Sequence, residues 1–74
     1  MSRGKEHGVI FEFITIGSYV RVAAVDTRTG TEVSIVGDPK RGERALRDLA
    51  LRKLEMVMKK RAETPGGGKG GLLA

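Results

Sequence analysis

The chain has 74 residues and a formal net charge of +5, with fourteen lysine and arginine residues against nine aspartate and glutamate residues. It contains no cysteine and one histidine, His7, which excludes disulfide frameworks, thiol catalysis and zinc sites built on thiolates. A core built from about sixty residues buries only about 60% of its unfolded surface, so we expect a single small domain that a second copy would help to stabilise.

The first eight residues are polar and contain Gly4 and Gly8, so we expect residues 1–8 to form a flexible N-terminus. They lack the apolar segment of a secretory signal, and no apolar run in the chain approaches the roughly 18 residues that cross a membrane. We therefore expect a cytoplasmic protein that makes no contact with membranes.

A hairpin is predicted next, because two strand-like runs, VIFEFITI (9–16) and YVRVAAVD (19–26), are separated only by Gly17 and Ser18. A second turn over residues 26–31 leads to a third run, TEVSIV (31–36). Both turns place apolar side chains on the same face, which predicts a three-stranded antiparallel meander with the strands side by side in chain order. Its core face carries Val9, Phe11, Phe13, Val20, Val22, Val33 and Ile35.

A helix is predicted over residues 39–62, where Asp38 is a good N-cap and Pro39 a good first residue. Apolar side chains recur at three- and four-residue spacing, at Leu46, Leu49, Ala50, Leu54, Val57 and Met58. Gly42 leaves open whether regular helix begins at residue 39 or near Glu43. Three cations fall inside the apolar arc and must extend their ends to water: Lys53, Lys60 and Arg61.

The fold class is therefore α+β, a β-β-β-α domain over residues 9–62 with the helix packed on one face of the sheet. The remaining residues, 63–74, are rich in glycine, and we expect them to form a disordered tail.

The types and spacing of the polar residues do not indicate a catalytic site. The acidic residues show no spacing that would create a shared site, and the serines and threonines have no base except His7. We therefore expect a protein that is not an enzyme, needs no metal or cofactor and takes no small-molecule substrate.

The outer face of the predicted sheet is the first candidate contact surface. One helix covers one face, which leaves an apolar set in water: Ile10, Ile14, Ile16, Tyr19, Ala23, Val25 and Val36. Contiguous apolar patches usually mark contact sites, so we expect a homodimer or a protein partner on this face. The alternative is that these are singly exposed apolar residues, which are normal on any protein surface.

The helix is the second candidate, because residues 39–62 carry nine basic and three acidic side chains. The cations at its start are Lys40, Arg41, Arg44 and Arg47. Three strands followed by such a helix resemble the C-terminal part of double-stranded-RNA-binding domains, which implies contact with duplex phosphates. The N-terminal helix of that family is missing, and its long first loop is here only Gly17 and Ser18. The alternative is a solvated helix face that keeps the protein soluble.

The layout FEF, GSYVRVAAVD, EVSIVGD, LALRKL and MVMKK, in this order, is also similar to that of short uncharacterised bacterial proteins classed as a domain of unknown function. The resemblance covers most of the chain and implies no activity, ligand or site.

Overall fold

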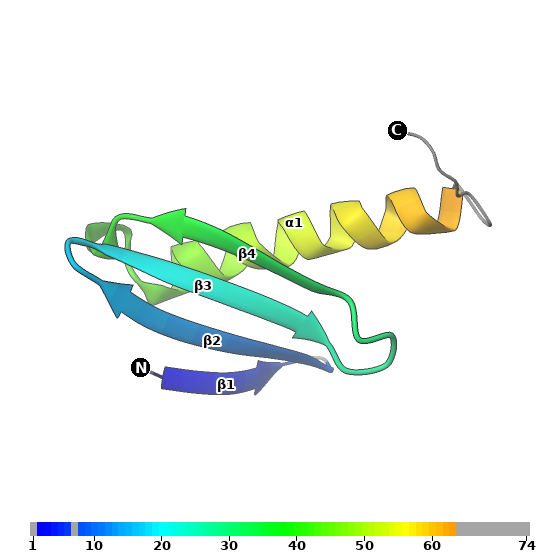
Figure 1. The fold of residues 1–74 in the computed structure, drawn as a ribbon, viewed down its shortest axis with the longest axis horizontal. Helices are drawn as coiled ribbons and strands as arrows, with labels where there is room; N and C mark the ends of the chain where they lie inside the picture. The colour runs from blue at the N-terminus through cyan, green and yellow to red at the C-terminus, as the bar shows by residue number, and fades with distance from the viewer. Residues whose placement is uncertain (1, 7, 64–74) are drawn as a thin grey trace.

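The computed structural model describes residues 2–6 and 8–63. They form a four-stranded antiparallel sheet in the order β1-β2-β3-β4, with a long helix behind it (Figure 1). The elements are β1 Ser2–Glu6, β2 Val9–Ile16, β3 Tyr19–Asp26, β4 Glu32–Gly37, the 3-10 helix η1 Pro39–Arg41 and α1 Glu43–Glu63. The α+β class, the antiparallel sheet and the C-terminal helix are therefore confirmed.

The prediction of three strands is wrong, because the sheet has a fourth strand, β1, in the segment assigned to the flexible N-terminus. β1 pairs with β2, with Gly4 opposite Phe11. Its sequence, SRGKE, has neither β-branched residues nor alternation, so it carries no local strand signal. It forms because β2 would otherwise leave a full row of backbone groups unpaired, and Gly8, at φ 79°, helps the chain turn back.

The predicted register is confirmed. Ile16 lies opposite Tyr19 across the Gly17–Ser18 turn, and Val22 lies opposite Ile35. The second turn closes as expected, with the Asp26 amide donating to the Thr31 carbonyl over 2.8 Å and Gly30 at φ 77°.

The core lies between α1 and the inner face of the sheet. Leu46, Ala50 and Leu54 of the helix are buried against the strands. Five of the predicted core residues are buried, namely Val9, Phe11, Val20, Val22 and Val33. Phe13 and Ile35 are only partly buried. Phe13 and Ile35 lie in one row across the sheet, on either side of buried Val22, and both pack against the core.

The predicted helix is divided at its start. Asp38 caps η1 by accepting a hydrogen bond from the Lys40 amide over 2.9 Å, but Gly42, at φ 92°, interrupts the helical backbone. α1 then begins at Glu43, with the Leu46 amide donating to the Gly42 carbonyl over 3.2 Å. Gly42 is thus a break between two helices.

Two of the cations inside the apolar arc bond outside the helix, Lys53 to β4 and Arg61 to the turn that precedes β4. The Lys53 Nζ donates to the Ser34 carbonyl and the Arg61 Nη1 to the Thr31 Oγ1, each over 2.9 Å. Across residues 2–6 and 8–63, no helix combines the length and the apolar character that crossing a membrane requires. α1 includes Glu63, which was predicted to be the first residue of the disordered tail, and residues 64–74 lie outside the described residues.

Candidate functional site

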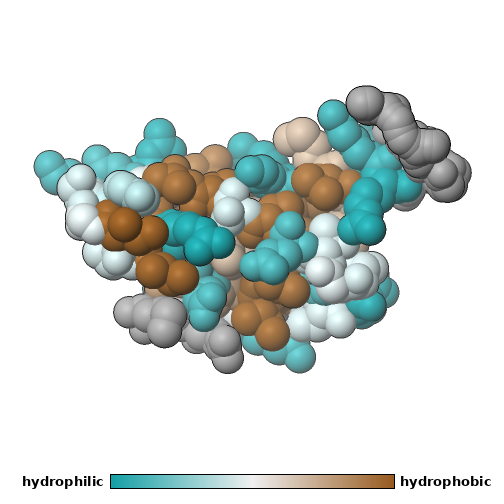
Figure 2. Space-filling view, in the orientation of Figure 1, coloured by the Kyte–Doolittle hydropathy of each residue, from teal (hydrophilic) through white to brown (hydrophobic). Residues whose placement is uncertain are grey.

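The outer face of the sheet is uncovered by any other element of the described chain. In Figure 1, β3 and β4 cross in front of α1, so this view looks onto the outer face. The same view in Figure 2 shows hydrophobic areas over the sheet, separated by hydrophilic side chains. The face is therefore a mixed surface rather than a continuous apolar one.

The structure places all the predicted contact residues on this face but exposes them unequally. Val36 is 63% exposed, Tyr19 41% and Ile16 39%. Ile10, Ile14 and Val25 are half-buried. Ala23 is only 5% exposed, because its short side chain lies below longer neighbours. Accessible apolar surface is thus concentrated on β2, β3 and β4 at the end of the outer face beside the Gly17–Ser18 turn.

We call this end of the outer face the hairpin-end patch, and it comprises Ile14, Ile16, Tyr19, Arg21 and Val36. The strand register explains why these five lie together. Ile14, Arg21 and Val36 form one row across β2, β3 and β4. Ile16 and Tyr19 form the next row, beside the turn. An arginine among exposed apolar and aromatic side chains is typical of the centre of a protein–protein interface.

The basic helix start lies at the same end of the molecule. Val20 is opposite Gly37, which brings η1 close to the turn of the hairpin. Lys40, Arg41 and Arg44 are all exposed there. Sequence reasoning proposed the two surfaces separately and did not place them side by side.

Backbone donors at the helix start are partly occupied. The Lys40 amide donates to the Asp38 carboxylate and the Arg41 amide to the Asp38 carbonyl, over 2.9 and 3.0 Å. Arg47 is half-buried and already interacts within the molecule. An anion at this end would therefore be bound by the side chains of Lys40, Arg41 and Arg44 rather than by the amides that begin η1.

The two edges of the sheet are protected. The Lys53 side chain reaches over the open edge of β4 to the Ser34 carbonyl, and exposed Lys5 lies on β1 at the other edge. Lysines on edge strands are a common defence against pairing with other chains. Sequence reasoning had placed Lys53 inside the apolar arc without finding this contact, which depends on how α1 lies across β4.

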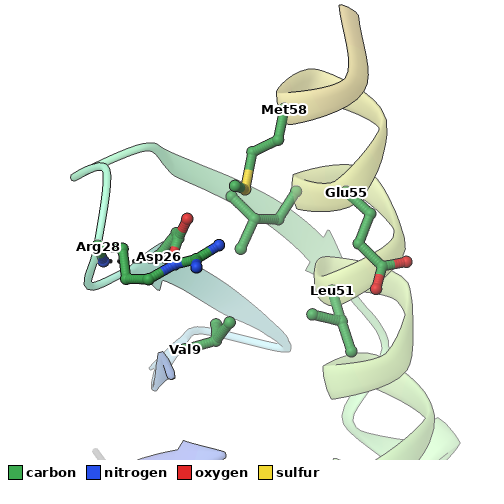
Figure 3. Close-up of a pocket in the computed structure, with 7 residues that line it drawn as sticks. Val9, Asp26, Arg28, Leu51, Glu55 and Met58 are labelled. Atoms are coloured by element: carbon green, nitrogen blue, oxygen red, sulfur yellow. Dashed lines mark hydrogen bonds between the residues drawn. The ribbon is translucent and has the colours of Figure 1, made fainter. Parts of the chain in front are cut away.

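A groove of about 420 Å³ runs beside the C-terminal half of α1. It is lined by Val9, Asp26, Arg28, Leu51, Leu54, Glu55 and Met58 (Figure 3). The Asp26 carboxylate already accepts hydrogen bonds from the Arg28 amide and the Thr29 hydroxyl. The Glu55 side chain points away from Asp26 (Figure 3). The groove therefore brings no pair of carboxylates together for acid–base chemistry.

Similarity to known proteins gives a second line of information, independent of the geometry of the site. A family described as a domain of unknown function, DUF6898, matches residues 6–61. No curated protein and no solved structure matches the chain significantly. The likeness to double-stranded-RNA-binding domains thus remains a prediction from the sequence.

Proposed function

Because the chain belongs to the DUF6898 family, whose description assigns no activity, we propose a function from the geometry. The chain is a non-enzymatic interaction module that binds protein through the outer face of its sheet. One observation carries the proposal: three large apolar or aromatic residues, Ile16, Tyr19 and Val36, are exposed together on that face.

The energetics favour burial of this patch. Covering a large apolar side chain completely is worth about 1.5–3 kcal/mol, and tyrosine and arginine often dominate binding energy at interfaces. Since the sheet edges are protected by Lys53 and Lys5, contact through the face is favoured over addition of a strand.

Site-specific photo-crosslinking tests the proposal. A photoreactive amino acid replaces Val36 in one variant and Met56 in a matched control. Both residues are largely exposed, at 63% and 56%, but Met56 lies on α1, in the other layer of the fold. We expect discrete protein adducts from position 36 in the cells that make the protein, and few or none from position 56. Equal yields from both positions would refute a binding surface on the outer face.

Nucleic-acid binding is the second candidate function, and the cluster of exposed cations Lys40, Arg41 and Arg44 favours it. Phosphate contacts of this kind weaken steeply with salt. We expect the double variant R41E/R44E to lose duplex binding measured by fluorescence anisotropy at about 50 mM salt and to show a shallower salt dependence. Equal binding by wild type and variant would eliminate this candidate.

A further inference from the structure

We propose that the partner on the outer face is an acidic protein, whose contact surface carries carboxylates beside apolar side chains. The apolar part covers the hairpin-end patch, and the carboxylates meet Arg21 within the patch and Lys40 and Arg41 at its rim. This joins the hairpin-end patch and the basic helix start in one contact surface. The inference rests on the proposed function and adds the chemistry of the partner.

The patch and the cations of η1 are close enough for one partner to contact both. Lys40 and Arg41 follow Val36 by four and five residues, so their Cα atoms lie within about 14 and about 18 Å of the Val36 Cα. In Figure 1 the turn between β2 and β3 and the start of α1 are at the same end of the molecule. A standard interface covers about 800 Å² of each partner and is therefore about 30 Å across, which includes both features.

These cations are available to a partner. In the described parts of the chain, no hydrogen bond or ion pair joins the side chain of Arg21, Lys40 or Arg41 to another residue. The two carboxylates nearest to η1 in sequence, those of Asp38 and Glu43, already interact within the molecule. The side chains of Lys40 and Arg41 are thus left to attract carboxylates of a partner and to steer its approach.

Arg21 makes an acidic partner necessary. It is half-buried between Ile14 and Val36, which lie opposite it on β2 and β4. When a partner covers the patch, the guanidinium of Arg21 loses its water, and a buried charge without a counterion is costly. A carboxylate on the partner removes this cost by accepting two hydrogen bonds from the guanidinium. A partner without carboxylates would leave Arg21 buried and unpaired.

The apolar residues of the patch favour a protein over a nucleic acid. Sites for single-stranded nucleic acids stack bases on aromatic side chains. Of the three aromatic residues in the chain, Phe11 and Phe13 pack in the core and only Tyr19 is on the outer face. Duplexes are held mainly through their phosphates. Exposed aliphatic side chains such as Ile16 and Val36 contribute to neither kind of contact.

Crosslinking from position 36 in charge-reversed chains tests the inference. The photoreactive amino acid at position 36 is combined with K40E/R41E and, as a matched control, with R52E/K59E, which changes the net charge equally at exposed positions of α1. We expect the yield of protein adducts to fall at least about tenfold in K40E/R41E, because two attractive contacts become repulsive. The yield should stay unchanged in R52E/K59E. All four side chains are exposed, so their reversal leaves the fold intact.

The adducts allow a second test on the partner itself. Mass spectrometry gives the residue of the partner that is linked to position 36, and we expect aspartate or glutamate residues beside it. Changing these to lysine should restore the adduct yield of K40E/R41E and lower that of the wild-type chain. A linked surface without carboxylates would overturn the inference.

Four further results would overturn it. An unchanged yield in K40E/R41E would show that these cations lie outside the contact, and an equal loss in R52E/K59E would show that only net charge matters. Adducts that nuclease removes would identify a nucleic acid, and adducts of twice the mass of the chain would identify a second copy. Protein adducts in the first two cases would leave the proposed function standing. A chain that gives no adducts from position 36 would refute both proposals.

Discussion

At the scale of single residues, Gly37 of β4 lies against the Leu46 side chain of α1 with no space for a Cβ. A Cβ built at this position would collide with the Cδ2 of Leu46, a residue that is 2% exposed in the core, so the Leu46 side chain would have to shift. We expect Gly37→Ala to lower the free energy of unfolding by about 1–3 kcal/mol through overpacking, measured by urea denaturation. Gly4→Ala is the matched control, because a Cβ there meets nothing within 4 Å. Equal stability of the Gly37 variant and wild type would contradict close packing of Leu46 on Gly37.

Asp26 is the residue that shapes the turn between β3 and β4. It is 6% exposed, and its carboxylate accepts hydrogen bonds from the Arg28 amide over 3.2 Å and from the Thr29 hydroxyl over 3.0 Å. Asp26→Ala leaves both donors without this acceptor, so we expect a loss of about 1–3 kcal/mol in unfolding free energy. Asp48→Ala, on the exposed side of α1, should change stability by less than about 0.5 kcal/mol. Thermal denaturation of the two variants makes the comparison, and similar losses would show that the Asp26 contacts contribute little.

At the scale of elements, β1 differs from the other strands in having β2 as its main neighbour, whereas α1 packs on β3 and β4. Residues that flank a two-residue turn form a hydrogen-bonded pair, so in β2 the amides of Glu12 and Ile14 face β3 and those of Phe11 and Phe13 face β1. We expect the amides of Phe11 and Phe13 to exchange with solvent at least about tenfold faster than those of Glu12 and Ile14. Hydrogen exchange followed by NMR gives each rate. Uniform protection along β2 would mean that β1 and β3 hold it equally well.

The open edge of β4 depends on α1 for its protection. The Lys53 Nζ donates to the Ser34 carbonyl over 2.9 Å and places a charge over the edge. Lys53→Met keeps the apolar stem and removes the charge, so we expect little change in stability but more edge-to-edge aggregation. Light scattering during incubation at high concentration measures this. Lys59→Met, an exposed lysine on the same helix, is the control, and equal aggregation of the two variants would argue against a protective role for Lys53.

Some features of these elements could be predicted from the sequence, and others could not. Two turns with clear signals set the register of β2, β3 and β4, and the register placed every predicted contact residue on the outer face. β1 could not be predicted, because its pairing comes from the open edge of β2 and not from its own residues. The unequal exposure of Val36 and Ala23 could not be predicted either, because it depends on the side chains of neighbouring strands. The contact between Lys53 and Ser34 needs the position of α1 across the sheet, which periodicity alone does not give.

At the scale of the whole molecule, one helix covers one face of a four-stranded sheet, and about sixty residues provide only a small core. Association that occurs only in the folded state adds to stability by mass action. If the hairpin-end patch joins two copies, the midpoint of thermal unfolding should rise with protein concentration, by about 5–10 °C over a hundredfold increase.

Two variants test which surface makes the midpoint of thermal unfolding rise with protein concentration. Val36→Asp places a charge in the patch, so its midpoint should be independent of concentration and match that of dilute wild type. Met56→Asp, on α1, should retain the wild-type dependence, because its residue lies in the layer opposite the outer face. A concentration dependence that persists in Val36→Asp would place the contact on another surface. A loss in both variants would indicate that added charge, rather than its position, controls association.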